Sequence, residues 1–188
     1  LKNEGNILPL KKTRTITLIG PLANSRQNMP GTWSVAARFS EAVSVLDGIK
    51  QVAGDKIKIN YALGSNLDYD PAFEERAGMY SEGSKRDERP ASEIINEALA
   101  AASNADVIVA AVGESSEMSG ESSSVTSIEI PRAQKDLLQA LLKTGKPVVA
   151  LLFTGRPLAL KWENENIPAI LNVWFGGSEA GAAIADVL

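Results

Sequence analysis

The 188-residue sequence contains neither cysteine nor histidine, and each absence excludes whole classes of chemistry. Without cysteine the chain forms no disulfide, has no thiol nucleophile and binds no metal through thiolates. Without histidine it cannot assemble a Ser-His-Asp or Cys-His group, nor the usual zinc sites, by itself. Acid–base chemistry within the chain must therefore come from carboxylates, lysine or tyrosine, and we expect neither a metal nor a cofactor.

Long apolar runs and concentrated positive charge are also missing. No apolar run approaches the roughly 20 residues of a membrane span, and the first residues do not form a signal sequence, so we expect no membrane partner. The net charge is −4 with a pI near 5.0, and the lysines and arginines are scattered, which argues against a nucleic-acid partner. With 44% hydrophobic and 22% charged residues, the chain can bury one sizeable core, and we expect residues 1–188 to form a single domain.

Apolar segments typical of strands alternate with amphipathic segments typical of helices. The predicted strands cover residues 15–19, 56–63, 107–112, 147–153 and 169–173, with a short apolar segment at 158–160 and a polar link after it. The predicted helices cover residues 41–52, 91–102, 131–145 and 179–188, the first with Ser40 as its N-cap. Residues 1–12 resemble a polar lead-in, and residues 64–90 a loop excursion or short helical detour. The alternation predicts an α/β fold, a three-layer sandwich with a mostly parallel sheet of five or six strands flanked by helices.

A long polar segment follows the buried strand at 107–112. It runs from Gly113 to Pro131, although most connections in compact domains have about 4 to 6 residues. It also leaves the carboxyl end of a strand, the edge where open α/β sheets usually bind ligands. Its glutamates are Glu114, Glu117, Glu121 and Glu129. The residues alone leave open whether this segment is a functional element or a solvated loop without a task.

Several segments together carry a resemblance to a known family. In chain order they read KNEGNILPL, LIGPLA, GTWS, VAAVGESSEMSGESSS followed by IEIP, GKPVVALLFTGRPLAL, and ILNVWFGGSEAG. Their order and spacing over essentially the whole chain resemble the second domain of glycoside hydrolase family 3. The similarity is strongest to the bacterial periplasmic β-glucosidases of that family.

The resemblance implies a domain that works as part of a larger enzyme. Members of the family have an amino-terminal (β/α)8 barrel with an aspartate nucleophile, then this sandwich, with the active site at the seam. The implied function is hydrolysis of terminal non-reducing β-D-glucosyl residues, with an oligosaccharide substrate, the missing barrel as partner, and a periplasmic or secreted location. We expect this chain to be a domain excised from that enzyme and inactive alone. We also expect apolar surface toward the barrel and a disordered loop at 113–131.

The resemblance assigns the proton donor of a retaining glycosidase to Glu121, the second glutamate of the GE…GE pattern. Retaining chemistry needs two carboxyl groups about 5 to 5.5 Å apart, and the donor must keep its proton near neutral pH. Glu114 and Glu117 are secondary candidates. For Glu114 the simpler interpretation is a side chain hydrogen-bonded to loop backbone, and for Glu117 a solvated residue.

The aromatic residue that matters most is Trp33 in the GTWS segment. The resemblance implies that this indole forms a wall of the subsite for the leaving sugar, because sugars pack their C–H faces on aromatic rings. The alternative is a tryptophan that covers the sheet edge. We expect Trp174 to lie in the core, Trp162 to cap the surface, and Arg156 to make structural hydrogen bonds rather than contact substrate.

One departure from the family pattern lies beside the proton donor. Relatives commonly read E-A-S-S-R-x-D-I, whereas this chain has Val125 and Ser127 in place of the arginine and aspartate. The loss of this possible ion pair leaves open a second hypothesis, a non-catalytic carbohydrate-binding or interaction module. A small-molecule-binding domain of the flavodoxin type remains a third interpretation on fold alone.

Overall fold

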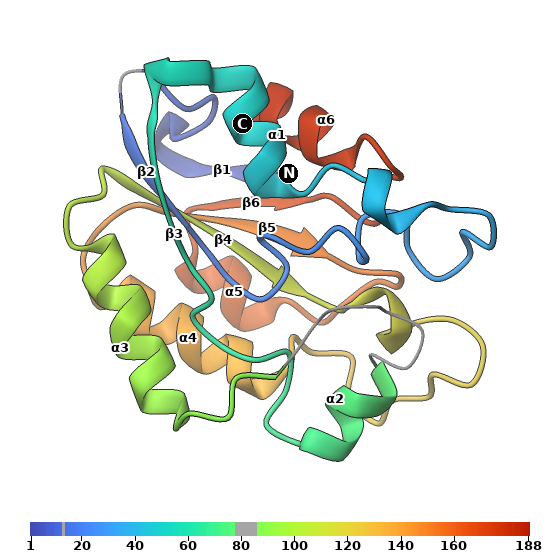
Figure 1. Ribbon diagram of the computed structural model, residues 1–188. Helices are drawn as coiled ribbons and strands as arrows, with labels where there is room; N and C mark the ends of the chain where they lie inside the picture. Colours follow the sequence, from blue (N-terminus) through green and yellow to red (C-terminus); the bar gives the residue numbers. More distant parts are fainter. Residues whose placement is uncertain (13, 78–85) are drawn as a thin grey trace.

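The computed structural model describes residues 1–12, 14–77 and 86–188, and its centre is a six-stranded sheet (Figure 1). The strands are β1 (Lys2–Asn3), β2 (Thr15–Ile19), β3 (Lys58–Ala62), β4 (Val107–Gly113), β5 (Val148–Phe153) and β6 (Ala169–Asn172). Their order is β1-β6-β5-β4-β2-β3, and β1 pairs antiparallel while the other pairs are parallel. This arrangement confirms the α/β fold with a mostly parallel sheet that the sequence predicts.

Helices cover both faces of the sheet and complete the three layers. One face carries α1 (Val45–Ala53) and α6 (Ala180–Val187), and the other carries α3 (Ala91–Ala102), α4 (Arg132–Leu142) and α5 (Lys161–Asn166) (Figure 1). A further helix, α2 (Pro71–Ala77), contacts the 3-10 turn at Ser116–Met118. Two separate hydrophobic clusters fill the spaces between the sheet and its two helical layers.

The central strands β4 and β5 are buried along their whole length. Along β4, Val107, Val109 and Ala111 belong to the cluster under α1 and α6, while Ile108 and Ala110 belong to the other. This division follows from the two-residue period of a strand, and it explains why a strand covered on both faces has a continuous apolar sequence. The edge strand β3 is only partly buried, as its alternating sequence predicts.

The first twelve residues are part of the fold, so their interpretation as a lead-in is wrong. Lys2 and Asn3 pair with Ile170 and Ala169 as the edge strand β1. The Asn3 side chain donates a hydrogen bond to the Leu8 carbonyl at 2.8 Å and accepts one from the Leu8 amide at 3.0 Å. A two-residue strand has no periodicity of its own, and its partner is distant in sequence, so no local pattern reveals it.

The structure also changes the limits of other predicted segments. The first predicted helix begins at Val45 rather than at residue 41, because Ser44, not Ser40, is its N-cap and accepts a hydrogen bond from the Asp47 amide at 3.1 Å. Residues 158–160 form no strand, and the polar link after them contains α5. Its sequence KWENEN lacks the apolar spacing by which a helix is recognised. The detour within residues 64–90 contains α2, and residues 78–85 of it lie outside the described part.

Among the described residues, no helix combines the length and the apolar character that crossing a bilayer requires.

Two glycines allow α1 and α6 to meet backbone to backbone. A β-carbon added at Gly48 would lie 2.0 Å from the Gly181 carbonyl oxygen, and one added at Gly181 would lie 2.1 Å from the Ser44 carbonyl oxygen. Both distances are far below any real contact, so neither position accepts a larger residue without moving a helix.

We expect Gly48→Ala to destabilise the fold by about 1 to 3 kcal/mol, the usual cost of overpacking. The substitution should otherwise favour an isolated helix by roughly 1 kcal/mol, so a loss of stability identifies the contact with α6 as its cause. Urea unfolding followed by circular dichroism measures the change, and Ala183→Ser on the exposed face of α6 is the control. A stabilised Gly48→Ala variant would contradict the close approach of the two helices.

Candidate functional site

The predicted site residues lie on loops that leave the carboxyl ends of the parallel strands. These ends share one edge of the sheet, on the right in Figure 1. The loop after β2 carries Trp33, the loop after β4 carries Glu114, Glu117 and Glu121, and the turn after β5 carries Arg156. The parallel topology therefore brings together residues that are more than 100 positions apart in the sequence.

The loop after β4 begins at a fixed point, Gly113. This glycine has a φ of +121°, and a β-carbon there would lie 2.0 Å from the Phe153 carbonyl oxygen, so only glycine fits. The fully buried Gln134 of α4 accepts a hydrogen bond from the Gly113 amide at 2.8 Å. Its side-chain nitrogen donates to the Gly113 and Leu67 carbonyls, both at 2.9 Å. No sequence motif marks this role of Gln134.

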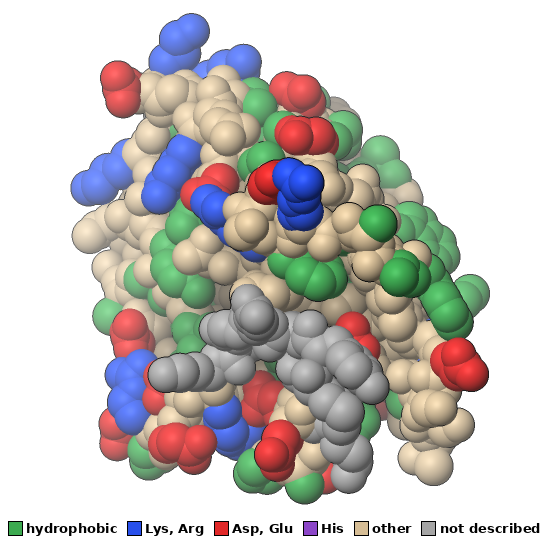
Figure 2. All heavy atoms as spheres, turned by 45° about the vertical axis from the view of Figure 1, so that its right-hand side comes forward, with side chains coloured by type: hydrophobic (Ala, Val, Ile, Leu, Met, Phe, Trp, Pro, Cys, Tyr) green, Lys and Arg blue, Asp and Glu red, His purple; other side chains and the backbone are tan. Residues whose placement is uncertain are grey.

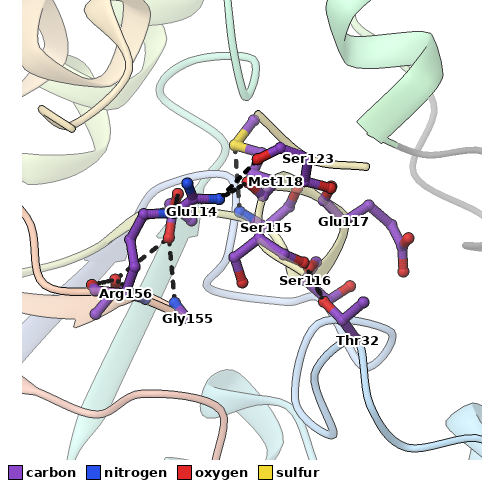
Figure 3. Close-up of polar contacts among 11 residues, drawn as sticks. Thr32, Glu114, Ser115, Ser116, Glu117, Met118, Ser123, Gly155 and Arg156 are labelled. Atoms are coloured by element: carbon purple, nitrogen blue, oxygen red, sulfur yellow. Dashed lines mark hydrogen bonds and ion pairs between the residues drawn. The ribbon is translucent and has the colours of Figure 1, made fainter. Parts of the chain in front are cut away.

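Glu114 is buried and already paired, with 4% of its surface exposed. One carboxylate oxygen lies 2.9 Å from the Arg156 Nε, and the other accepts hydrogen bonds from the Gly155 amide at 3.1 Å and the Thr154 hydroxyl at 3.3 Å (Figure 3). These contacts match the simpler interpretation of Glu114 as a side chain bonded to loop backbone. Both carboxylate oxygens of Glu114 are therefore engaged in joining the start of the loop to the turn after β5.

The middle of the same loop is attached to the loop after β2. The Ser116 amide donates a hydrogen bond to the buried Asn28 side chain at 2.7 Å. The Thr32 hydroxyl donates to the Ser119 carbonyl at 2.8 Å and also contacts the Ser116 carbonyl (Figure 3). The two loops are therefore joined through side chains that no sequence pattern marks, because polar residues in loops show no distinguishing spacing.

Glu121 lies next to this junction and is exposed. Its neighbours Gly120 and Ser122 have φ values of +117° and +63°, so the backbone turns sharply on both sides of it. A β-carbon added at Gly120 would lie 2.8 Å from Thr32 and 3.6 Å from the Trp33 ring. The structure thus brings the segments of Glu121 and Trp33 side by side.

Trp33 is 73% exposed, so most of its ring is available to a ligand or a partner surface. Other large apolar side chains on the loops of this edge are also exposed, namely Val35, Ile128 and Trp174. Figure 2, which turns this edge forward, shows hydrophobic side chains gathered on the right of the view. The expected apolar surface is therefore present among the described residues, and its orientation toward a barrel stays a prediction.

Glu117 differs from the solvated residue that the sequence suggests, because it is half-buried. Burial raises the pKa of the Glu117 carboxyl above its usual value, and a hydrogen bond from Ser116 acts in the opposite direction. Its side chain points away from the cluster around Arg156 (Figure 3). Glu117 therefore stays a secondary candidate beside Glu121.

The expectation that Trp174 lies in the core is wrong. Trp174 is 48% exposed and has a φ of +55°, which is rare for a bulky side chain. The strand β6 ends at Asn172, so the backbone leaves the sheet before Trp174. Phe175 is the aromatic residue that packs inward, against Gly31. Trp162 is half-buried on α5, with the Lys135 ammonium 5.7 Å from its ring centre.

A hollow of about 470 Å³ lies beneath the second half of the loop after β4. Val125 and Ser127, the residues that depart from the family pattern, line it together with Glu114 and Lys135. Within the described residues, no group of three or more acidic side chains is arranged to hold a metal ion. The expected disorder of the loop at 113–131 stays a prediction.

Comparison with known proteins gives a consistent assignment. A family model described as the glycosyl hydrolase family 3 C-terminal domain matches residues 1–188. The chain is 49% identical to a periplasmic beta-glucosidase of Salmonella typhimurium and 38% identical to a beta-xylosidase of Formosa agariphila, in each case over all of this chain. It covers 25% and 24% of those proteins, so it spans about a quarter of their length.

Solved structures show the same relationship. The crystal structure of a beta-glucosidase from Listeria innocua in complex with isofagomine superposes with a TM-score of 0.81 at 33% identity. That similarity covers 99% of this chain and 22% of the Listeria chain. A beta-glucosidase from Bifidobacterium adolescentis superposes with a TM-score of 0.76 at 26% identity, over all of this chain and 24% of its own.

We expect Thr32→Val to loosen the junction between the two loops without disturbing the core. The substitution keeps the shape of the side chain but removes the hydroxyl that contacts the Ser116 and Ser119 carbonyls, at a cost of about 1 kcal/mol. Amide hydrogen exchange should become faster at residues 116–121 and stay unchanged in β4. Thr126 is an exposed threonine of the loop after β4, and Thr126→Val provides the matched control. Equal exchange in both variants would show that the Thr32 hydroxyl does not hold the loop.

Proposed function

Because this chain belongs to glycosyl hydrolase family 3, as a C-terminal domain of that family, we propose that it supplies the proton donor of a retaining β-glucosidase. The whole enzyme would hydrolyse terminal non-reducing β-D-glucosyl residues of oligosaccharides. Its attacking aspartate would belong to an amino-terminal barrel domain. The relatives named beta-glucosidase support this substrate class, and the periplasmic relative supports a periplasmic or secreted location.

The observation that carries the proposal is the position of Glu121, exposed at a sharply turned segment and next to Trp33. A general acid must come within hydrogen-bond reach of the oxygen that it protonates, so it needs access and a defined location. The junction through Thr32 provides the location, and the exposed ring of Trp33 provides a surface for the leaving sugar.

The two carboxyl groups would act in two steps. In the first step the barrel aspartate attacks the anomeric carbon while Glu121 gives its proton to the leaving oxygen. In the second step the Glu121 carboxylate takes a proton from water, which hydrolyses the glycosyl–enzyme intermediate. The barrel would have to exclude water from Glu121 when the site closes, because a proton donor of this kind acts in a site shielded from solvent. The isolated chain should therefore be inactive.

A non-catalytic carbohydrate-binding module is the second candidate, favoured by Val125 and Ser127 beside the donor segment. The two functions differ in what must precede this chain. A barrel whose strand carries an aspartate supports the enzyme, and a preceding sequence without one supports the binding module.

Replacing the proton donor tests the proposal directly. In the full-length enzyme, Glu121→Gln should lower kcat/KM for an unactivated disaccharide by about 10² to 10⁴-fold, the usual contribution of a general acid. Steady-state kinetics with cellobiose measure this loss.

Glu117→Gln is the matched control, because it makes the same change four residues earlier in the loop. Wild-type turnover by Glu121→Gln would refute the assignment, and a large loss only in Glu117→Gln would transfer the role to Glu117.

Trp33→Ala in the full-length enzyme tests the sugar-binding wall. Loss of a ring that packs on the leaving sugar is worth about 1.4 kcal/mol, or roughly tenfold in kcat/KM for a disaccharide. Methyl β-glucoside puts no sugar in that subsite, so its hydrolysis should change little. Trp33→Phe should recover part of the activity toward the disaccharide. Equal losses on both substrates would mean that Trp33 does not contact the leaving sugar.

A further inference from the structure

We propose that Arg156 is a positioning residue that holds the Glu121 carboxyl at the place where it transfers its proton. The inference rests on the proposed function of Glu121. It concerns a residue outside the loop that carries the donor, in the turn after β5.

The guanidinium of Arg156 joins three points of the loop after β4. Its Nε lies 2.9 Å from a carboxylate oxygen of Glu114, where the loop begins (Figure 3). Its Nη2 donates hydrogen bonds to the Met118 carbonyl at 2.5 Å and to the Ser123 carbonyl at 3.1 Å. Met118 is three residues before Glu121 and Ser123 is two residues after it, so one planar group connects both arms of the turn.

The turn at Glu121 requires such support because its backbone is unusual on both sides. Gly120 and Ser122 both have positive φ values, and a non-glycine residue in that region carries a conformational cost. A conformation of this kind persists only when surrounding contacts stabilise it. The two carbonyls held by Arg156 close the segment that contains both residues.

Arg156 is itself fixed by the ends of two central strands. Its amide donates a hydrogen bond to the Thr154 hydroxyl at 3.1 Å, and the neighbouring Gly155 amide donates to Glu114 at 3.1 Å. A β-carbon at Gly155 would lie 1.7 Å from the Ser119 hydroxyl, so the turn and the loop are in direct contact. The position of Glu121 is therefore fixed relative to β4 and β5, which are buried along their whole length.

An arginine suits this role better than a lysine would. The guanidinium is a rigid fork with several N–H donors, so it can pair with a carboxylate and bond two carbonyls in one fixed geometry. A lysine ammonium on a flexible stem keeps the charge but not the geometry. The Arg156 side chain is only 24% exposed, which limits competition from water for these bonds.

The expected consequence is a selective loss of proton transfer. A displacement of about 1 Å at a reacting group can lower a rate about 10²-fold. Substrates with poor leaving groups depend on the proton, whereas activated aryl glucosides leave without much help. A misplaced donor therefore makes the rate depend more steeply on the leaving group, and a general loss of folded enzyme does not.

The test uses the full-length enzyme and a series of aryl β-glucosides whose phenol leaving groups have pKa values from about 4 to about 10. Arg156→Gln should lower kcat/KM about 10²-fold for the poorest leaving group and less than about threefold for the best. Arg156→Lys keeps a positive charge beside Glu114, so it should fold as the wild type does. Its kcat/KM should still depend more steeply on the leaving-group pKa than that of the wild type. If Arg156→Gln does not fold, Arg156→Lys decides the question.

Two further variants serve as controls. Arg132→Gln removes an exposed arginine paired with Asp136 and should leave the dependence of kcat/KM on leaving-group pKa unchanged. One outcome is that Glu121→Gln steepens the dependence of kcat/KM on leaving-group pKa while the Arg156 variants lower kcat/KM equally for all substrates or for none. In that case the positioning role is wrong and the proposed function stands. If Glu121→Gln keeps the wild-type dependence, the proposed function itself fails and the inference fails with it.

Discussion

The ion pair between Glu114 and Arg156 is the contact on which the rest of the site depends. It joins the residue after β4 to the turn after β5, with Glu114 buried and Arg156 half-buried. Removing Arg156 would leave the charge of the buried Glu114 without its partner, which is destabilising. Glu114 thus has a structural task, whereas Glu117 and Glu121 are not tied to Arg156 and Glu129 lies 3.7 Å from the Lys135 ammonium.

The loop after β4 is held firmly where it leaves the sheet, and it is accessible to solvent at Glu121. Gly113 is fixed by Gln134, and the middle of the loop is bonded to Asn28 and Thr32. Beyond these contacts Glu121 is exposed to solvent, whereas glycosidase proton donors act in sites that exclude water. The chain therefore carries a defined location for a proton donor but not the dry environment that would tune it. The proposed barrel domain would complete that environment and cover the exposed apolar side chains at the same edge.

Several parts of the fold and the site follow from local sequence. Continuous apolar runs identify β4 and β5, because a strand covered on both faces contains few polar residues. The long segment after Gly113 is recognisable because most connections are much shorter, and its place at a carboxyl strand end follows from the alternation of strands and helices. The resemblance of the GTWS and GE…GE segments to family 3 directs attention to Trp33 and Glu121, and the matching family model confirms that membership.

The remaining features depend on contacts between distant residues, which no local pattern contains. β1 exists only because Lys2 and Asn3 meet β6, and Trp174 is exposed because the backbone turns out of the sheet after Asn172. The bonds of Arg156 to carbonyls more than 30 positions earlier in the chain likewise appear only after folding. Sequence by itself determined the layers, the loop and the family, since these rest on periodicity and residue type. Only the tertiary structure decided which side chains hold the loop, since hydrogen bonds to a backbone carbonyl leave no trace in the sequence of the residue that accepts them.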